Sequence, residues 1–168
     1  FSDSPQKNKI LEHHIQNQGI SRFEKIPLYL ELSHKEMTQE NIEYFTNKFS
    51  DIVIEKVINS EWVEGVLDFI INLKRQKHVI VTGTPQNEIE IILQKLNIRE
   101  KFEEIHGSPK KKSDIIYDYI KRNSYTNSET IMIGDSREDK IAAKNNDIDF
   151  YLVMNEFNED IEKNQCTY

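Results

Sequence analysis

The sequence predicts an α/β fold, in which helices flank a mostly parallel sheet and a helical segment comes before it. From Trp62 onward, short apolar runs alternate with amphipathic stretches of helical period, as they do in parallel α/β units. Residues 5–58 have helical periodicity and no convincing strand. Two of the apolar runs end in Thr-Gly and Gly-Asp, and such sheets bind ligands at the carboxyl ends of their strands.

The N-terminal helices are expected to form a separate helical domain of residues 4–59. The stretch 6–18 places its apolar side chains close to one helical face. Ser21 and Glu24 have the spacing of a capping box, which would begin a second helix. Residues 38–58 carry apolar side chains at helical spacing and predict a third helix.

The α/β domain is expected to span residues 60–168. Its predicted strands are 78–84, 102–108, 130–136 and 150–154, and its predicted helices are 63–77, 85–98, 110–123 and 138–148. The runs at 78–84 and 130–136 are short and β-branched, which is typical of buried parallel strands. Thr84 is the expected N-cap of the helix at 85–98, with Pro85 at its first position.

The composition limits the possible partners and the compartment. The net charge of the 168-residue chain is −7, which disfavours a broad nucleic-acid or membrane-surface role. The net charge does not exclude a local basic site that binds a phosphorylated small molecule. No apolar run approaches the roughly 20 residues that span a bilayer. Cys166 is the single cysteine, so we expect no internal disulfide and a reducing, cytoplasmic compartment. The composition does not indicate an oligomeric state.

Two stretches carry groups that could bind a phosphate. Thr82 and Gly83 offer a hydroxyl and backbone N–H groups at a strand-to-helix turn, although an ordinary turn is the alternative. Lys110, Lys111 and Lys112 begin a predicted helix. They could supply a positive charge or simply form a solvated helix start. A basic run at a helix N-terminus opposes the helix dipole, which favours a functional reason.

A third stretch could hold a metal. Asp135 ends a predicted strand, and Asp139 lies one turn into the next helix. Carboxylates placed in this way suit Mg²⁺, which favours phosphate chemistry. The alternative is that Asp135 and Ser136 only cap the helix, but a cap accounts for one acid and not for two. The five histidines show no metal-ligand spacing, and we expect structural or surface roles for them.

The order of these parts resembles the haloacid dehalogenase-like superfamily, most of whose members are Mg²⁺-dependent phosphatases. Thr82 matches the Ser or Thr that follows a buried strand in that family, and GSPKKKSDII at 107–116 resembles its lysine motif, with Lys112 as the lysine. GDSREDKIAA at 134–143 matches its acidic motif, with Asp135 and Asp139 as the acids. The resemblance is to members like phosphoglycolate phosphatase and β-phosphoglucomutase, and it implies a Rossmann-like core with an inserted helical cap.

One family motif has no counterpart here. Members carry DxDG followed by Val or Thr after the first strand, where the first Asp is the nucleophile and the second is the general acid and base. FSDSP at residues 1–5 resembles the sequence that follows this motif. We therefore expect the first core strand and both aspartates to lie upstream of Phe1. Asp3 is not assigned as a nucleophile, because no strand precedes it.

The resemblance implies a Mg²⁺-dependent phosphomonoester hydrolase that acts on a small phosphorylated metabolite, with a sugar phosphate as one candidate. Thr82 and Lys112 would hold the phosphoryl oxygens, Asp135 would hold Mg²⁺, and Asp139 would bind the metal or orient its surroundings. No nucleic-acid or membrane partner is expected.

Arg22 and Lys25 follow the first predicted turn of the helical domain and could reach the substrate, or they could lie on a solvated helix face.

Two alternatives to the phosphatase stay open. One is a phosphomutase of the same superfamily, and the other is a catalytically inactive remnant with a binding role.

Overall fold

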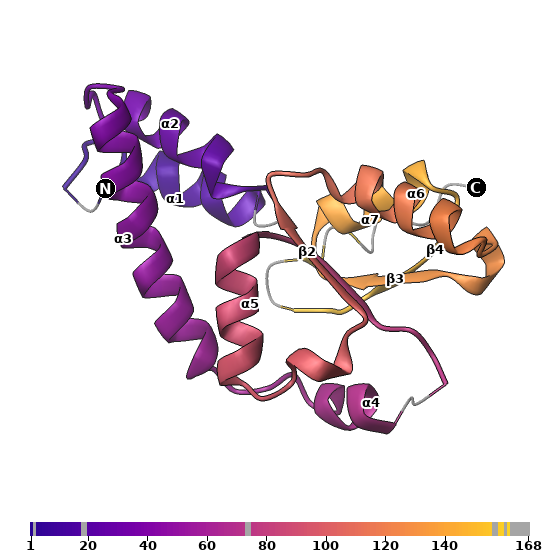
Figure 1. The fold of residues 1–168 in the computed structure, drawn as a ribbon. Helices are drawn as coiled ribbons and strands as arrows, with labels where there is room; N and C mark the ends of the chain where they lie inside the picture. The colour runs from indigo at the N-terminus through magenta and orange to yellow at the C-terminus, as the bar shows by residue number, and fades with distance from the viewer. Residues whose placement is uncertain (2, 18–19, 73–74, 156–157, 160, 162–168) are drawn as a thin grey trace.

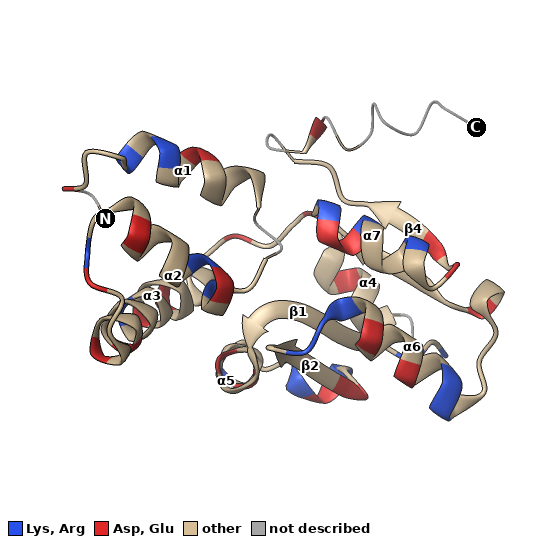
Figure 2. Ribbon diagram, turned by 90° about the horizontal axis from the view of Figure 1, so that it is seen from above, with Lys and Arg blue, Asp and Glu red and all other residues tan. Residues whose placement is uncertain are grey.

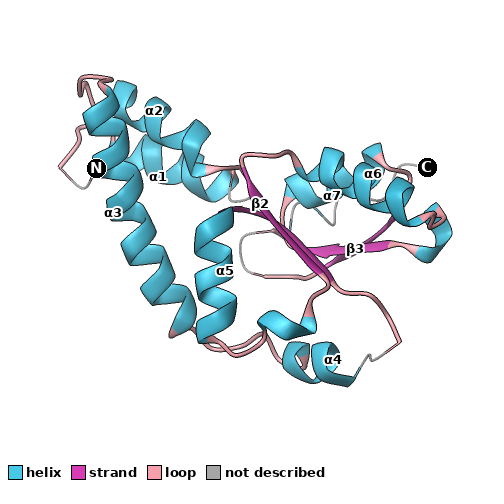
Figure 3. Cartoon of the chain, viewed as in Figure 1, coloured by secondary structure: helices cyan, strands magenta, loops and turns pink. Residues whose placement is uncertain are grey.

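The computed structural model describes residues 1, 3–17, 20–72, 75–155, 158, 159 and 161. It has the mixed α/β fold that the sequence predicts (Figure 1, Figure 3). The helices are α1 (Lys7–Gln16), α2 (Arg22–Leu32), α3 (Gln39–Ile58), α4 (Val66–Asn72), α5 (Gln86–Lys95), α6 (Lys112–Asn123) and α7 (Arg137–Asn145). The strands are β1 (Val79–Pro85), β2 (Glu104–Ser108), β3 (Ile131–Gly134) and β4 (Asp149–Leu152).

Helices α1, α2 and α3 pack together as a helical segment on one side of the molecule (Figure 1). Ser21 caps α2, since its hydroxyl accepts a hydrogen bond from the Phe23 amide. Helix α3 contacts α5, and this contact joins the helical segment to the α/β part of the chain. None of the helices in the described ranges is both long and apolar enough to cross a membrane. The domain boundary between residues 59 and 60 stays a prediction.

The strands form two parallel pairs instead of one sheet. β1 pairs with β2, where Ile80 lies opposite Ile105, and β3 pairs with β4, where Met132 lies opposite Phe150. Within the described residues, no strand pairing joins the two pairs. β1 and β3 therefore each have one edge that no described strand covers.

The core lies between β1, β2 and α5, where Leu93, Ile98 and Ile105 are buried against each other. The prediction of a buried strand at 130–136 is wrong in one respect. Ile131 is 56% exposed and Ile133 is 42% exposed, and alternate residues of a strand share a face. In the part of the chain that the structure describes, no element covers that face of β3.

The turn after β1 differs from the prediction. β1 continues through Pro85, which is the N-cap of α5, so Thr84 is not the cap. Gln86 instead fixes the turn on β2, because its side-chain amide donates to the Ile105 carbonyl at 2.9 Å and accepts from the Gly107 amide at 2.6 Å. A Cβ at position 107 would lie 2.5 Å from the Thr84 carbonyl oxygen. Glycine there permits the close approach that holds residues 82–84 at the site.

Candidate active site

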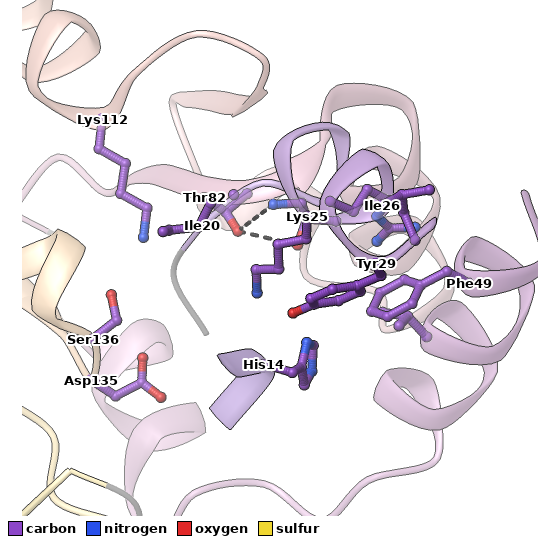
Figure 4. Close-up of a pocket in the computed structure, with 14 residues that line it drawn as sticks. His14, Ile20, Lys25, Ile26, Tyr29, Phe49, Thr82, Lys112, Asp135 and Ser136 are labelled. Carbon is purple, nitrogen blue, oxygen red and sulfur yellow. Dashed lines mark hydrogen bonds between the residues drawn. The ribbon is translucent and has the colours of Figure 1, made fainter. Parts of the chain in front are cut away.

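A pocket of about 280 Å³ lies between the helical segment and the carboxyl ends of β1 and β3 (Figure 4). The helical segment lines it with His14, Ile20, Arg22, Lys25, Ile26, Tyr29, Phe49 and Val53. The α/β part lines it with Thr82, Gly83, Thr84, Lys112, Asp135 and Ser136. Every site residue proposed from the sequence lines this pocket except Asp139.

Thr82 presents a polar turn to the pocket. Its Oγ1 accepts a hydrogen bond from the Thr84 amide at 3.1 Å and lies 3.2 Å from the Thr84 hydroxyl. Thr82, Gly83 and Thr84 all line the pocket, and the Thr82 and Thr84 hydroxyls lie together there. Hydroxyl and amide donors in such a turn can bind the oxygens of an anion.

Lys112 is the lysine of the basic run that reaches the pocket (Figure 4). It is the first residue of α6, after a basic stretch that follows β2 (Figure 2). Lys112 Nζ donates to Asp139 Oδ1 at 2.6 Å, and both side chains are largely buried. Lys110 instead pairs with Asp118 at the surface. The ion pair with Asp139 holds the Lys112 ammonium in place at the pocket wall.

Asp139 is a structural anchor in this geometry. Its Oδ2 accepts from the Ser136 amide at 3.1 Å and from the Ser136 hydroxyl at 2.7 Å. The Asp139 amide in turn donates to Ser136 Oγ, which completes a capping box at the start of α7. With Lys112 on Oδ1, both carboxylate oxygens accept hydrogen bonds, and Asp139 orients Lys112 in this structure. That Asp139 also binds a metal stays a prediction.

The glycine before Asp135 leaves room for this anchor. A Cβ at Gly134 would lie 2.5–2.7 Å from side-chain atoms of Asp139, well inside van der Waals contact. Any larger residue at position 134 would displace the Asp139 carboxylate and, with it, Lys112. The Gly-Asp sequence at the end of β3 is therefore a packing requirement as well as a polar motif.

Asp135 has a different environment. It is exposed and lines the pocket, and Asn155 Nδ2 donates to its Oδ2 at 3.3 Å. The buried Asn158 amide donates to the Asp135 carbonyl at 2.9 Å and to the Val153 carbonyl at 2.9 Å. These contacts tie the turn that carries Asp135 to the segment after β4, and the carboxylate faces the pocket (Figure 4).

The described residues contain no group of three or more His, Cys, Asp or Glu side chains that could hold a metal. Asp135 alone offers a carboxylate at the pocket. Mg²⁺ commonly binds through one or two carboxylates, with waters and substrate phosphate as its other ligands. One accessible carboxylate beside hydroxyl, amide and ammonium groups fits that mode, and it would provide part of the coordination sphere.

Arg22 is committed to a buried ion pair. Its guanidinium contacts the Glu88 carboxylate at 2.8 and 2.9 Å and donates to the Ser50 hydroxyl at 2.7 Å. Phe49 lies under the guanidinium at 4.8 Å. Glu88 is on α5, so this cluster joins α2 and α3 to the α/β part. Arg22 lines the pocket, and its charge is neutralised by Glu88.

Lys25 points into the pocket from α2 (Figure 4). The residue is 5% exposed, and burial together with the Arg22 charge lowers the pKa of its ammonium to about 8. Burial also lowers the pKa of His14 and raises the pKa of Tyr29 to about 12. Near pH 7 the helical wall of the pocket therefore presents two cations, Lys25 and the Arg22 that pairs with Glu88, together with a neutral imidazole and a neutral phenol.

The sequence matches a family model over residues 7–153, a range that includes Thr82, Lys112 and Asp135. The model describes haloacid dehalogenase-like hydrolases. The chain belongs to this family. No significant match was found among curated protein sequences. Membership confirms the family expected from the Thr, Lys and Gly-Asp motifs.

Solved structures of the family have the same fold. A haloacid dehalogenase-like hydrolase from Streptococcus pneumoniae has a TM-score of 0.62 at 19% identity, with 77% of this chain and 65% of that chain covered. A predicted phosphoglycolate phosphatase from Haemophilus somnus 129PT has a TM-score of 0.65 at 20% identity, with 81% and 65% covered. A suggested β-phosphoglucomutase from Thermotoga maritima has a TM-score of 0.63 at 22% identity, with 89% and 71% covered.

The chain thus spans about 65% of the length of the first two of these proteins. At these identities the likeness establishes the fold. It agrees with a Rossmann-like α/β core accompanied by helices.

Several residues that line or support the pocket were not foreseen from the sequence. His14 and Tyr29 lie on predicted helices, but the signals that predict a helix do not say which polar side chain faces a pocket. Glu88 and Asn158 contact partners 66 and 23 residues away, and no local spacing marks them. The spacing of Ser136 and Asp139 could have predicted their capping box. This box accounts for Asp139, the second acid of the motif.

Proposed function

We propose that the protein is a Mg²⁺-dependent phosphatase that hydrolyses a small phosphorylated metabolite, with a sugar phosphate as one candidate. One observation carries the proposal. Thr82, Lys112 and Asp135 come from three separate elements and line the same pocket. Together they combine anion-binding donors with a carboxylate suited to a hard cation.

The residues of the chain have distinct roles in this proposal. Thr82 and the Gly83 turn bind two of the phosphoryl oxygens, and Lys112 stabilises the negative charge on the third. Asp139 fixes the Lys112 ammonium through the 2.6 Å ion pair. Asp135 would hold Mg²⁺, which when bound neutralises charge on the phosphoryl group.

The nucleophile of the proposed reaction is an Asp upstream of Phe1 that forms an aspartyl-phosphate, and a second upstream Asp is the acid and base. The arrangement of the strands supports a place for them. β1 and β3 each have an edge without a described partner, and the residues at their carboxyl ends line one pocket. A parallel strand between them would bring its own carboxyl end to Thr82 and Asp135.

The helical segment would serve as a cap. It supplies one wall of the pocket, and a cap excludes water and selects the leaving group. The Arg22–Glu88 pair would hold this cap against α5.

The test is the turnover of p-nitrophenyl phosphate and a panel of sugar phosphates by the full-length protein, with Mg²⁺ and with EDTA. We expect release of inorganic phosphate that requires Mg²⁺. No Mg²⁺-dependent turnover of any of these compounds would contradict the proposal. Product analysis with a hexose 1-phosphate separates the alternative, because a mutase yields the 6-phosphate instead of free phosphate.

A further inference from the structure

The segment that follows β4 holds the turn that carries Asp135. The Val153 amide donates to the Gly134 carbonyl at 2.8 Å, which continues the β3–β4 pairing past the last residue of β4. Asn158 Nδ2 donates to the Asp135 carbonyl at 2.9 Å, and Asn155 Nδ2 donates to Asp135 Oδ2 at 3.3 Å. Side chains 20 and 23 residues further along the chain therefore contact both the carboxylate and the backbone of Asp135.

Asn158 is the buried centre of these contacts, with 3% of the residue exposed. Its Nδ2 donates to the carbonyls of Asp135 and Val153, both at 2.9 Å. Its Oδ1 accepts a hydrogen bond from the Asn155 amide at 2.9 Å. A side-chain amide has two N–H donors, and a buried polar group is costly unless its hydrogen bonds are made. The bonds of Asn158 thus fix the Asp135 turn relative to Asn155, the residue that contacts the Asp135 carboxylate.

Capping of α7 does not account for Asn158. Ser136 is the N-cap of α7, and its capping box with Asp139 already fixes the start of the helix. Within the described residues, the hydrogen bonds of the Asn158 side chain go to Asp135, Val153 and Asn155, and not to the capping box. The network therefore acts on the residue before the cap, which is the residue with the accessible carboxylate.

We propose that Asn158, acting with Asn155, is a positioning residue that holds the Asp135 carboxylate in the orientation in which it would bind Mg²⁺. Asp135 is exposed and faces the pocket (Figure 4), and an exposed side chain loses rotamer freedom when it binds a cation unless it is already held. The two asparagines lie outside the described lining of the pocket. The inference rests on the proposed function for the role of Asp135, and it adds that metal affinity depends on the segment after β4.

The direct test is binding of Mn²⁺ to the full-length protein, measured from the electron paramagnetic resonance signal of unbound Mn²⁺, because it needs no turnover. We expect Asn158→Ala to raise the Kd for Mn²⁺ by about 10- to 100-fold, the usual effect of losing a partner that orients a metal ligand. Asn155→Ala removes one long hydrogen bond and should raise the Kd by about three- to tenfold. Because Asn158 holds the Asn155 backbone, the double variant should stay within about threefold of Asn158→Ala.

The matched control is Asn146→Ala. Asn146 Nδ2 also bridges two backbone carbonyls, those of Ser113 at 3.0 Å and Ala142 at 2.9 Å, but at the end of α7 away from Asp135. Asn146→Ala and Asn158→Ala should both lower the Tm of the metal-free protein, since each leaves buried carbonyls without a donor. The Kd of Asn146→Ala for Mn²⁺ should stay within about threefold of the wild type.

A kinetic measurement separates positioning from a general loss of structure. With p-nitrophenyl phosphate, Asn158→Ala should raise the Mg²⁺ concentration that gives half-maximal activity, and kcat at saturating Mg²⁺ should return to within about threefold of the wild type. A structural defect would instead lower kcat at every Mg²⁺ concentration.

A Kd for Mn²⁺ that stays within about threefold of the wild type in both Asn158→Ala and Asn155→Ala would overturn the inference alone. An equal rise in Asn146→Ala would also overturn it, because any loss of packing would then suffice. Asn155 is half-buried, so Asn155→Ala decides the question if Asn158→Ala does not fold. A wild type that binds no Mn²⁺ contradicts the role of Asp135 and the inference together. A wild type that binds Mn²⁺ but releases no phosphate contradicts the phosphatase only.

Discussion

Asp135→Asn in the full-length protein is expected to lower Mg²⁺-dependent kcat/KM by on the order of 10³-fold, the effect of losing several kcal/mol of transition-state stabilisation. The substitution keeps the size of the side chain and an oxygen that can accept from Asn155, which lies 3.3 Å away. It removes the negative charge that we assign to the metal. Steady-state kinetics at increasing Mg²⁺ concentration, with p-nitrophenyl phosphate, measures the effect.

The control for Asp135→Asn is Asp149→Asn. Asp149 is exposed and lies opposite Ile131, at the end of the β3–β4 pair away from the pocket. It should retain wild-type activity and the same dependence on Mg²⁺. If Asp135→Asn instead kept more than about a tenth of the activity with an unchanged Mg²⁺ dependence, Asp135 would not be the metal-binding acid.

Glu88→Gln is expected to lower the free energy of unfolding by about 3 kcal/mol, because it leaves the Arg22 guanidinium buried without its counter-charge. The pair is almost fully buried, with 6% and 11% of the two side chains exposed. Denaturant unfolding at constant m-value measures the loss. Activity should fall as well, since Arg22 and Lys25 lie on the same helix and the pair holds that helix against α5.

The control for Glu88→Gln lies on the same helix. Glu90 pairs with Arg99 at 2.7 Å, but about 30% of each side chain is exposed. Glu90→Gln should therefore cost less than about 1 kcal/mol. The double variant Arg22→Met with Glu88→Leu should regain much of the loss, because apolar replacements remove both buried charges. A loss for Glu88→Gln no larger than that for Glu90→Gln would contradict the assigned role.

The order of elements and the location of the site could be read from the sequence, because their signals are local. Thr82 follows an apolar run, and Asp135 ends another. In parallel α/β folds these positions meet at one edge of the sheet. The choice of Lys112 within a run of three lysines relied on the family resemblance. The structure places Lys112 at the pocket and turns Lys110 towards Asp118.

The roles of individual charges could not be read in the same way, because they depend on distant partners. Arg22 was expected either to reach the substrate or to lie on a solvated helix face, but it is buried and Glu88, on a helix far along the chain, neutralises it. Asp139 was expected to bind the metal or to orient its surroundings, and in the structure its two oxygens accept hydrogen bonds from Lys112 and Ser136. Whether a charged side chain is free is a property of the packed structure.

A crystal structure of the full-length protein with Mn²⁺, a Mg²⁺ substitute with an anomalous signal, and inorganic phosphate tests the proposed site most directly. We predict an anomalous peak within coordinating distance of the Asp135 carboxylate, at about 2.1–2.3 Å, and a phosphate that contacts Thr82 Oγ1 and Lys112 Nζ. A metal bound elsewhere, or a phosphate that contacts neither residue, would contradict the assignment of this pocket as a Mg²⁺-dependent phosphatase site.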